Sequence, residues 1–243
     1  MLHRLFGDPG NDLVRGSTGD DYLAGVTGDD TLKGEFSKDT LNGGLGNDLL
    51  QGGDNDDLLF GSGNSDRLFG SGNSDRLFGN SGNDLLIAGF GNDRLAGSFG
   101  RDTLKGESGT DILAGGDNDD LLQGGDGNDS LSGQNGNDRL FGGNGNDRLF
   151  GGLGQNTIAG GAGEDEFLFT TSSQSVGEIT DFTVGSDMLQ IGTGANDTSD
   201  RFIYNSDTGN LFYDSDGTGS NQKVKLVGLD SGLALTNNNF ELF

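Results

Sequence analysis

Aspartate recurs at every ninth position through two thirds of this sequence. Stepping by nine from residue 12 meets an aspartate or an asparagine eighteen times without a slip, at Asp12, Asp21, Asp30, Asp39, Asp48, Asp57, Asp66, Asp75, Asp84, Asp93, Asp102, Asp111, Asp120, Asp129, Asp138, Asp147, Asn156 and Asp165. Carboxylates are ligands for hard divalent cations, so this array could bind metal. It offers no glycosidase pair, because that chemistry needs two carboxylates in distinct environments within a cleft.

Other catalytic groups are scarce in the chain. His3 is the only histidine, and there is no cysteine. These counts argue against a His-dependent triad, a cysteine nucleophile, a disulfide framework and a thiolate zinc site. The sequence therefore predicts a protein that is not an enzyme.

The aspartate belongs to a nine-residue unit that is repeated eighteen times from residue 7 to residue 168. With the aspartate at position six, position one is Gly in every unit except the one that begins at Ala88. Position four is Gly in thirteen units, Asn in four and Ser37 in one, and position eight is always apolar. The unit reads G-x-x-G-x-D-x-L-x, and residues 61–78 contain one unit, GSGNSDRLF, written twice.

Each position of the unit predicts a local structure. Gly and Asn enter left-handed backbone conformations at low cost, so position four indicates a positive φ and the first six residues a turn. The last three residues, such as 67–69, predict a short strand whose central side chain points inward. One buried residue in nine cannot form a core alone, so the units must stack. The prediction is an all-β solenoid of about nine 18-residue coils, with two parallel sheets facing each other across a column of leucines.

Stacking would place one aspartate above another along both edges of the solenoid, where like charges repel. The chain has 14 Lys and Arg against 39 Asp and Glu, a net charge of −25, so basic side chains are too few to neutralise them. Oxygen-only ligands suit Ca²⁺ better than Mg²⁺, which demands a tighter octahedron, or Zn²⁺, which prefers His or Cys. The alternatives are a metal-free solenoid and an acidic surface that serves solubility.

The same charge excludes some partners. A strongly acidic chain is poorly suited to nucleic acid or to an anionic membrane surface. No run approaches the ~18 apolar residues of a membrane span. The sequence therefore predicts neither a nucleic-acid partner nor a membrane-spanning segment.

The unit resembles the G-G-x-G-x-D-x-U-x nonapeptide of RTX (repeats-in-toxin) calcium-binding proteins, which form a right-handed parallel β-roll. In that family each Ca²⁺ takes the carbonyls of positions two and four and the carboxylate of position six, then the carbonyls of positions one and three and a second carboxylate one coil later. The resemblance implies one ion among Ser62, Asn64, Asp66, Gly79, Ser81 and Asp84, and one on the other edge among Ser71, Asn73, Asp75, Ala88, Phe90 and Asp93. The matching carbonyls of later units are those of Gly115, Asp117, Gly124, Asp126, Gly133, Asn135, Gly142, Asn144, Gly151, Leu153, Gly160 and Ala162.

Eighteen units, less the two that lack a successor one coil on, imply up to about sixteen calcium ions. Departures from the pattern predict weaker sites near Pro9 and Ser37. Asn156 keeps an oxygen but loses a charge, so its sites should be weak or empty.

Residues 169–243 break the period and predict a separate β segment that caps the open end of a roll formed by residues 1–168. Strand patterns occupy 178–192, 223–229 and 239–243, and residues 201–214 predict a hairpin. The ITDF segment, the FYDSDGTG turn and the final Glu241, Leu242 and Phe243 resemble the C-terminal caps of serralysin-type proteins. That resemblance implies export by type I secretion machinery. DSDGTG at 214–219 lacks the later acidic ligand of an EF-hand and predicts a plain turn.

The N-terminus has no apolar run of the length that a cleaved secretory signal requires. We therefore expect an extracellular protein, secreted without such a signal, that stays disordered at low calcium and folds when calcium binds. One alternative is a secretion and stabilisation module of a larger secreted protease, lipase or polysaccharide epimerase, and another is a surface or adhesive component. A glycan or protein partner stays open, but the outward aromatic side chains should be split between the two sheets, with Phe60, Phe78 and Phe150 on one and Phe69 and Phe141 on the other.

Overall fold

The structure, a computed structural model, describes residues 3–170, 177–192, 201–205, 207–214, 223–235 and 239–242. Its strands form two sheets. The first contains β1 (Arg4–Phe6), β3 (Tyr22–Thr27), β5 (Thr40–Leu45), β7 (Leu58–Gly63), β9 (Arg76–Ser81), β11 (Arg94–Phe99), β13 (Ile112–Asp117), β15 (Ser130–Asn135), β17 (Arg148–Phe150), β19 (Glu166–Thr170), β21 (Met188–Gly192) and β25 (Phe240–Leu242). The second contains β2 (Leu13–Thr18), β4 (Thr31–Phe36), β6 (Leu49–Asp54), β8 (Arg67–Gly72), β10 (Leu85–Phe90), β12 (Thr103–Ser108), β14 (Leu121–Asp126), β16 (Arg139–Asn144), β18 (Thr157–Ala162), β20 (Gly177–Ile179), β24 (Lys223–Gly228), β23 (Asn210–Asp214) and β22 (Arg201–Asn205).

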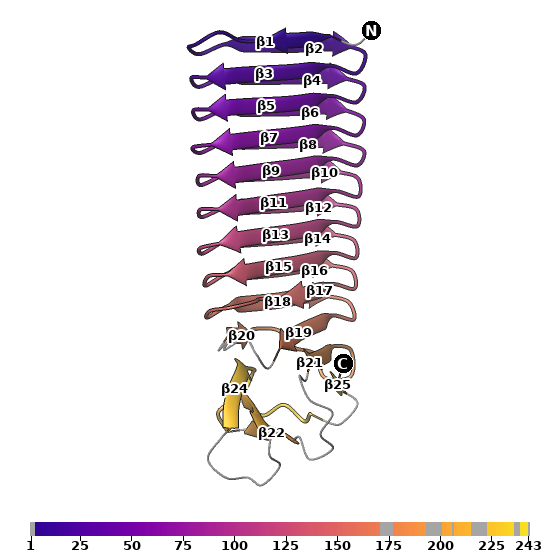
Figure 1. The fold of residues 1–243 in the computed structure, drawn as a ribbon. Coiled ribbons are helices and arrows are strands. Elements are labelled where there is room, and N and C mark those ends of the chain that lie inside the picture. The colour runs from indigo at the N-terminus through magenta and orange to yellow at the C-terminus, as the bar shows by residue number, and fades with distance from the viewer. Residues whose placement is uncertain are drawn as a thin grey trace.

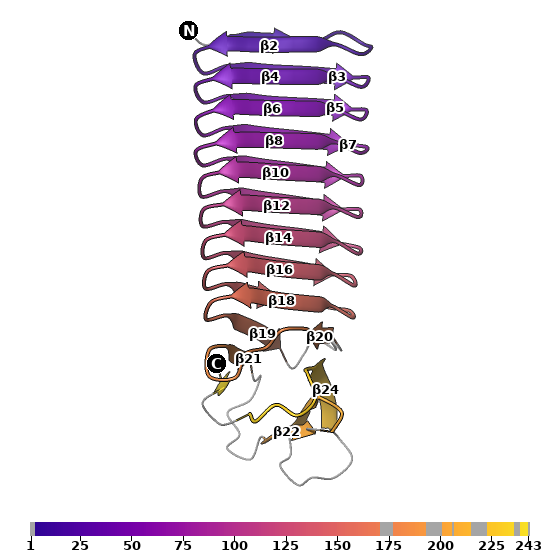
Figure 2. The same ribbon diagram turned by 180° about the vertical axis from the view of Figure 1, so that it is seen from behind.

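The chain winds as a parallel β-solenoid, which confirms the predicted fold class (Figures 1 and 2). From β1 to β21, odd-numbered strands lie in one sheet and even-numbered strands in the other, so two consecutive strands make one coil. Each strand pairs in parallel with the strand one coil later, as when Leu68 of β8 aligns with Leu86 of β10. Because two units fill one coil, the last three residues of the two GSGNSDRLF copies, 67–69 and 76–78, lie in different sheets. Within the described residues no helix has the length and apolar character needed to cross a membrane.

The core is a column of position-eight side chains between the two sheets. The fifteen leucines at every ninth residue from Leu23 to Leu149 are at most 2% exposed. Ile158, Phe167 and Leu189 continue the column toward the C-terminal segment. Each coil therefore contributes two buried apolar side chains, and burial is continuous only because the coils stack.

The strands are longer than the sequence predicts. Most run for six residues, from position seven of one unit to position three of the next, so the turn is only positions four to six. The prediction of a six-residue turn is wrong because position two also adopts a positive φ, in seventeen of the eighteen units, without ending the strand. Successive coils bend identically there, so a left-handed residue stacks on a left-handed residue and the ladder of hydrogen bonds stays in register.

The solenoid extends beyond the repeat at both ends, giving about ten turns rather than the predicted nine. At the N-terminus β1 adds a strand in which Leu5 aligns with Leu23. At the C-terminus β20 and β21 pair in parallel with β18 and β19, with a step of 22 residues from Phe167 to Leu189 instead of 18. Residues 178–192 therefore form two strands in different sheets, not one strand.

The predicted hairpin at residues 201–214 is confirmed as β22 and β23, which pair antiparallel. Its neighbour β24 joins β20 in the even-numbered sheet, and β25 joins β21 in the odd-numbered sheet. The predicted strands at 223–229 and 239–243 correspond to β24 and β25. Of the DSDGTG segment, residues 215–219 lie outside the described residues.

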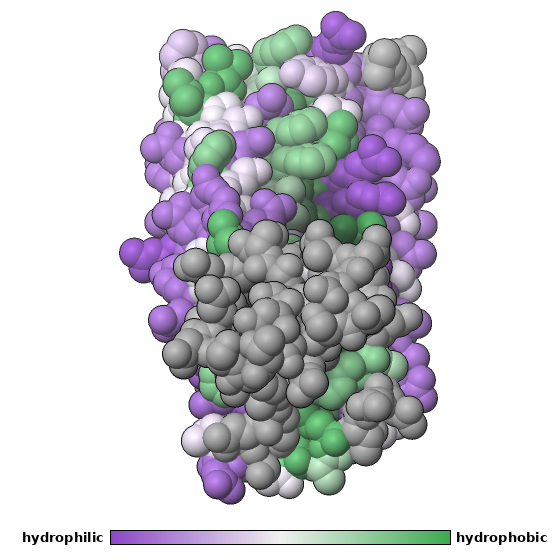
Figure 3. Space-filling model, turned by 60° about the horizontal axis from the view of Figure 1, so that its bottom comes forward, coloured by the Kyte–Doolittle hydropathy of each residue, from purple (hydrophilic) through white to green (hydrophobic). Residues whose placement is uncertain are grey.

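Charge is segregated between the flat faces and the turn edges of the roll. At positions seven and nine, whose side chains face outward, eight residues of the eighteen units are Lys or Arg and only Glu166 is acidic. Hydrophobic side chains gather along the middle of a sheet face and hydrophilic ones toward its edges (Figure 3). Phe60 and Phe78 stack on one sheet with ring centroids 5.2 Å apart, whereas Phe69 lies on the other sheet, as predicted.

Candidate metal centre

The position-six aspartates form two ladders, one along each row of turns. We call the turns before even-numbered strands edge A, which contains Asp12 to Asn156, and the turns before odd-numbered strands edge B, which contains Asp21 to Asp165. Along both edges, Oδ1 of each aspartate accepts the backbone N–H of the aspartate one coil earlier, as in the 2.7 Å bond from Asp66 to Asp84. From Asp21 to Asp165 the ladder side chains are at most 3% exposed. Each carboxylate is therefore fixed in a dry turn by the backbone.

The second carboxylate oxygen, Oδ2, is buried and has no hydrogen-bond partner in sixteen ladder residues. They are Asp21, Asp30, Asp39, Asp48, Asp57, Asp66, Asp75, Asp84, Asp93, Asp102, Asp111, Asp120, Asp129, Asp138, Asp147 and Asp165. A buried carboxylate oxygen without a partner is strongly unfavourable, and native proteins contain few such atoms. Sixteen of them in identical environments indicate a binding partner that repeats with the coil.

Backbone oxygens line the same space as Oδ2. A methyl group built on the position-one glycine Gly106 would contact Asp111 Oδ2 and would lie 2.6 Å from the Gly124 carbonyl oxygen of the next coil. Glycine at position one therefore leaves a small cradle in which a carboxylate oxygen and a backbone carbonyl oxygen lie close together. Carboxylate and carbonyl oxygens are the donor set that Ca²⁺ prefers, so these residues fit that ion.

A site built from side chains alone is not present. Among the described residues there is no group of three or more His, Cys, Asp or Glu side chains placed to hold a metal. Each position between successive coils offers two ladder carboxylates, so a metal bound there would need further oxygens from the backbone. The side chains at positions two and three vary widely, whereas position one is Gly in every unit except that of Ala88 and position four is Gly, Asn or Ser37.

The structure brings the predicted ligand residues of the first example together in neighbouring coils. Asp66 and Asp84 are hydrogen-bonded, Ser62 aligns with Asn80, and Gly63 aligns with Ser81. Asn64 has a φ of +73°, and its carbonyl lies against Gly82 of the next coil. Asn at position four thus adopts the left-handed conformation that the sequence predicts.

The second example, on edge B, repeats this arrangement. Asp75 donates its N–H to Asp93 Oδ1 at 2.7 Å, and Ser71 aligns with Gly89. Asn73 has a φ of +72°, close to that of Asn64. At position one Ala88 is fully buried, so its methyl group occupies the cradle that glycine leaves open elsewhere. Ser37, the other unusual residue, also adopts a positive φ of +79°.

Burial raises the pKa of the interior aspartates above the ordinary value of 3.8, because a carboxylate loses its hydration in the turn. The pKa reaches about 8 for Asp66 and Asp75 and about 7 for Asp111. The neighbouring ladder carboxylates raise these pKa values further, while the hydrogen bond from the preceding coil lowers them by less than burial raises them. Without metal, Asp66 and Asp75 therefore favour protons at neutral pH, whereas ladder aspartates with a pKa of about 6, such as Asp102, are largely ionised there.

Calcium affinity is expected to fall as the pH is lowered from about 8 to about 6, the range of the raised pKa values. A raised pKa means that the metal-free folded roll binds protons that the unfolded chain has lost. Protonation therefore stabilises the metal-free roll at low pH, and this contribution disappears as the pH rises through the raised pKa values. Calcium binds the ionised carboxylates, so protons compete with it. Calcium titrations at several pH values check this, and an affinity independent of pH across that range would contradict it.

The four ends of the two ladders are closed by other groups. Asp12 Oδ2 accepts the N–H of Asp8 at 2.9 Å. His3 occupies the ladder position before Asp21, where its N–H donates to Asp21 Oδ1 at 2.8 Å. His3 is therefore a ladder residue that the sequence analysis missed, although it lies nine residues before Asp12.

Asp187 closes edge B at the C-terminal end and is a second ladder residue that the sequence analysis missed. Its Oδ1 accepts the N–H of Asp165 at 3.3 Å, and its Oδ2 accepts the N–H of Thr183 at 2.7 Å. Gly185 has a φ of +93°, as position four requires. The signal is the G-S-D-M-L sequence of residues 185–189, which keeps the spacing of the repeat but follows a step of 22 residues.

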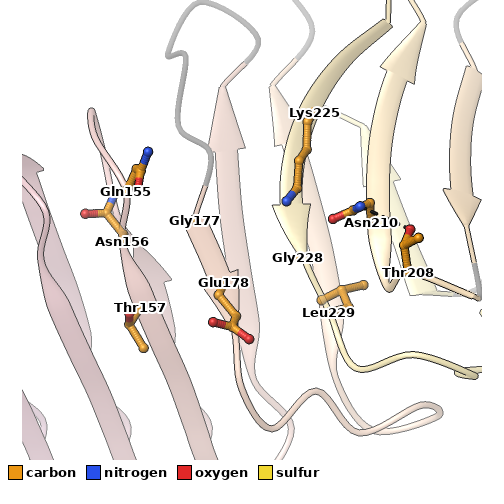
Figure 4. Close-up of a pocket in the computed structure, with 10 residues that line it drawn as sticks. All are labelled: Gln155, Asn156, Thr157, Gly177, Glu178, Thr208, Asn210, Lys225, Gly228 and Leu229. Carbon is orange, nitrogen blue, oxygen red and sulfur yellow. Dashed lines mark hydrogen bonds between the residues drawn. The ribbon is translucent and has the colours of Figure 1, made fainter.

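Edge A ends at Asn156. Its Oδ1 accepts the N–H of Asp138 at 2.8 Å, but its Nδ2 donates to the Gly152 carbonyl at 3.5 Å. Beyond it lies a cavity of about 420 Å³ between the roll and the C-terminal strands, lined in part by Glu178 and Lys225 (Figure 4). No further ladder aspartate follows among the described residues of this edge, so the amide ends the ladder without leaving an unpaired charge.

The match to a family model agrees with a calcium-binding repeat. A family model described as the RTX calcium-binding nonapeptide repeat (4 copies) matches residues 4–32, 15–50, 33–68, 69–104, 87–122, 105–140, 114–149 and 132–167. Among solved structures, the AlgE6R3 subunit of the mannuronan C5-epimerase from Azotobacter vinelandii is 24% identical, with a TM-score of 0.37, and the match covers 52% of this chain and 80% of that one. No curated protein matches the chain.

Proposed function

Because the chain belongs to the RTX calcium-binding nonapeptide-repeat family, we propose that it is a structural module whose roll folds when Ca²⁺ binds between successive coils. The observation that carries this proposal is the set of sixteen buried Oδ2 atoms without a partner. A divalent cation beside each of them would satisfy the orphaned oxygen and neutralise the like charges one coil apart. Metal binding would then be part of the folding free energy.

The proposed ligands of each ion are the two carboxylates and the four carbonyls described for the family. Along edge A one such set is Ser62, Asn64, Asp66, Gly79, Ser81 and Asp84, and along edge B one is Ser71, Asn73, Asp75, Ala88, Phe90 and Asp93. The buried, hydrogen-bonded aspartates support this proposal directly, and the alignment of the coils supports the carbonyls. Up to about sixteen divalent ions would then bind, and their positive charge would offset the formal net charge of −25.

The C-terminal segment is proposed to cap the roll and to carry a type I secretion signal, in line with its resemblance to serralysin-type caps. Support for the capping role comes from Asp181, whose carboxylate accepts the N–H groups of Gly160 and Gly161 at 3.0 and 2.9 Å. Secretion without a cleaved signal to a calcium-rich extracellular medium would let the chain fold after export. A module of a larger secreted enzyme and a surface component would both use the same calcium-dependent roll.

Native mass spectrometry in calcium is expected to show a series of bound ions that extends to about sixteen. In the Asn156→Asp variant, the amide that donates to Gly152 becomes a carboxylate, and the position between residues 138 and 156 gains its second charge. This variant should bind one more tightly held ion than the parent chain. Binding of only one or two ions by the parent chain or by the variant would contradict the proposed function.

The matched control is Asn146→Asp on the opposite edge. It makes the same change of charge at an exposed position-five residue whose oxygen already accepts the N–H of Glu164. This variant should bind the same number of ions as the parent chain. An equal gain in both variants would show that added charge alone, and not the ladder, determines the ion count.

A further inference from the structure

A second ladder, at position five, joins the coils without metal. Along edge A the position-five oxygen of one coil accepts the backbone N–H of position five in the next, as when Asn83 Oδ1 accepts the N–H of Arg101 at 2.8 Å. Asn92 Oδ1 accepts the N–H of Thr110 at 2.8 Å on edge B. This ladder runs in the opposite sense to the aspartate ladder, in which the later coil supplies the acceptor. Its side chains are exposed, so it is a set of clamps on the outside of the turns.

The clamps are present at most joints between successive coils. Within residues 11–164, all of them described, thirteen such bonds join sixteen pairs of position-five residues. The three pairs without a bond are 38 with 56, 101 with 119, and 110 with 128. Lys38 has an ion pair with Asp56 instead, with Nζ 2.6 Å from Oδ2. The other two gaps fall at the same level of the roll, one on each edge.

The joint between residues 101–117 and residues 119–135 is therefore the only one in this stretch that lacks both clamps. Arg101 has no side-chain acceptor for the N–H of Asp119, and Thr110 makes no bond to the N–H of Asn128. The same joint also contains a long backbone hydrogen bond. The N–H of Gly100 lies 3.3 Å from the Asp117 carbonyl, whereas the equivalent bond one coil earlier, from Gly82 to Phe99, is 2.9 Å.

The Asp117 carbonyl at this joint also has a competing donor. Asn118 Nδ2 donates to it at 2.7 Å, which is shorter than the bond from Gly100 across the joint. The joint keeps its strand pairing and the aspartate bonds, such as that from Asp102 to Asp120 at 2.8 Å. What it lacks are the two position-five clamps, which do not depend on the charge of the ladder. With neither position-five clamp, this joint is expected to depend on bound metal more than the joints that have them.

We propose that the roll is divided at this joint into two cooperative blocks, residues 7–117 and residues 118–168, which separate when calcium is scarce. This inference rests on the proposed function, since it assumes that calcium holds the coils together. In a solenoid each coil contacts only its neighbours, so stability is a sum of coil and joint contributions and cooperativity breaks at the weakest joint. The first block contains twelve units and the second six, so each has enough coils to form a core of its own.

Hydrogen exchange followed by mass spectrometry, at a series of free calcium concentrations, tests the proposal. Peptides from residues 7–117 are expected to lose protection together, and peptides from 118–168 to do so at a different calcium concentration. Loss of protection in one step along residues 7–168 would overturn the two-block inference but leave the proposed function intact. Exchange that does not respond to calcium anywhere in the roll would overturn the proposed function itself.

Two variants locate the boundary. Arg101→Asn with Thr110→Asn supplies both missing acceptors and is expected to merge the two steps into one. Residues can also be exchanged between adjacent coils, as Asn83→Arg, Asn92→Thr, Arg101→Asn and Thr110→Asn. This exchange leaves the composition unchanged and should move the boundary 18 residues toward the N-terminus. All four positions are exposed, so neither variant disturbs the core. A boundary that stays at residue 117 in both variants would contradict the role of the clamps.

Discussion

Removing calcium with a chelator is expected to convert the roll to a largely disordered chain. The core contributes only two position-eight side chains per coil, and the sixteen interior aspartates would face one another in dry turns without a counter-charge. Leaving a single buried polar group unsatisfied costs about 1–3 kcal/mol, and more for a charged group. Repeated along both edges, this cost exceeds the 5–15 kcal/mol by which a typical domain is stable. Circular dichroism should therefore show loss of the β signal in chelator at neutral pH and its return when calcium is added.

Magnesium provides the control for this experiment. Mg²⁺ has the same charge as Ca²⁺, but it demands a compact octahedron of ligands and retains several of its waters. A cradle of two carboxylates and backbone carbonyls does not supply that geometry. It is therefore expected to restore little of the β signal at a concentration where calcium restores all of it. A β spectrum that persists in chelator would show that the aspartate ladder is stable without metal, and equal recovery in magnesium would show that charge screening alone is sufficient.

The sequence predicts the roll itself well, because the residue type at each informative position follows from one physical requirement. Leucine at position eight reports burial, and the structure buries all fifteen. Glycine or asparagine at position four reports a left-handed backbone, which is present in every unit, including that of Ser37. Aspartate at position six reports the ladder. These requirements are local to the unit, so a repeat without a slip is enough to place the buried side chain, the left-handed residue and the ladder aspartate of each unit and to predict the two sheets.

The features that the sequence does not predict depend on how the coils stack rather than on the residues of a single nine-residue unit. Position two carries residues as different as Val26 and Glu107, both with positive φ. The residue types at this position therefore do not indicate its backbone conformation. Adjacent coils with the same bend can still pair, and only the assembled structure shows that the strand continues through it. The exposed clamps of position five are equally hidden, because Asn, Asp and Ser there also suit an ordinary turn.

The ends of the ladders were missed for a different reason. Asp187 follows a step of 22 residues, and a buried Phe182 stands where the repeat has glycine, so a search at period nine stops at Asp165. At the other end, His3 keeps the period but not the residue type. A terminal coil has a neighbour on one side only. Hydrogen-bond donors of the protein therefore take the place of metal at a terminal coil, and the residue types there differ from those of the repeat.

Replacing a mid-ladder aspartate is expected to remove two ions at once. Asp111 is fully buried, and its carboxylate lies between the coils of Asp93 and Asp129. Asp111→Asn keeps an oxygen for the N–H of Asp93 but loses the charge, so it should lose up to two calcium ions together with the folding free energy that their binding contributes. Asp111→Ala also leaves that buried N–H without a partner, which adds about 1–3 kcal/mol of destabilisation. Ion counts by native mass spectrometry and urea unfolding in saturating calcium measure the two effects separately.

Asp119→Asn is the matched control, because it makes the same change of charge outside the aspartate ladder. Asp119 is exposed, and its Oδ1 accepts the N–H of Asn137 at 2.8 Å, a bond that an asparagine oxygen can also accept. This variant should bind as many ions as the parent chain and unfold at the same urea concentration. If Asp119→Asn and Asp111→Asn lost ions equally, the binding would follow overall charge and not the ladder. If Asp111→Ala were no less stable than Asp111→Asn, the bond to Asp93 would contribute nothing to the joint, and the ladder would be a row of ligands without a structural role of its own.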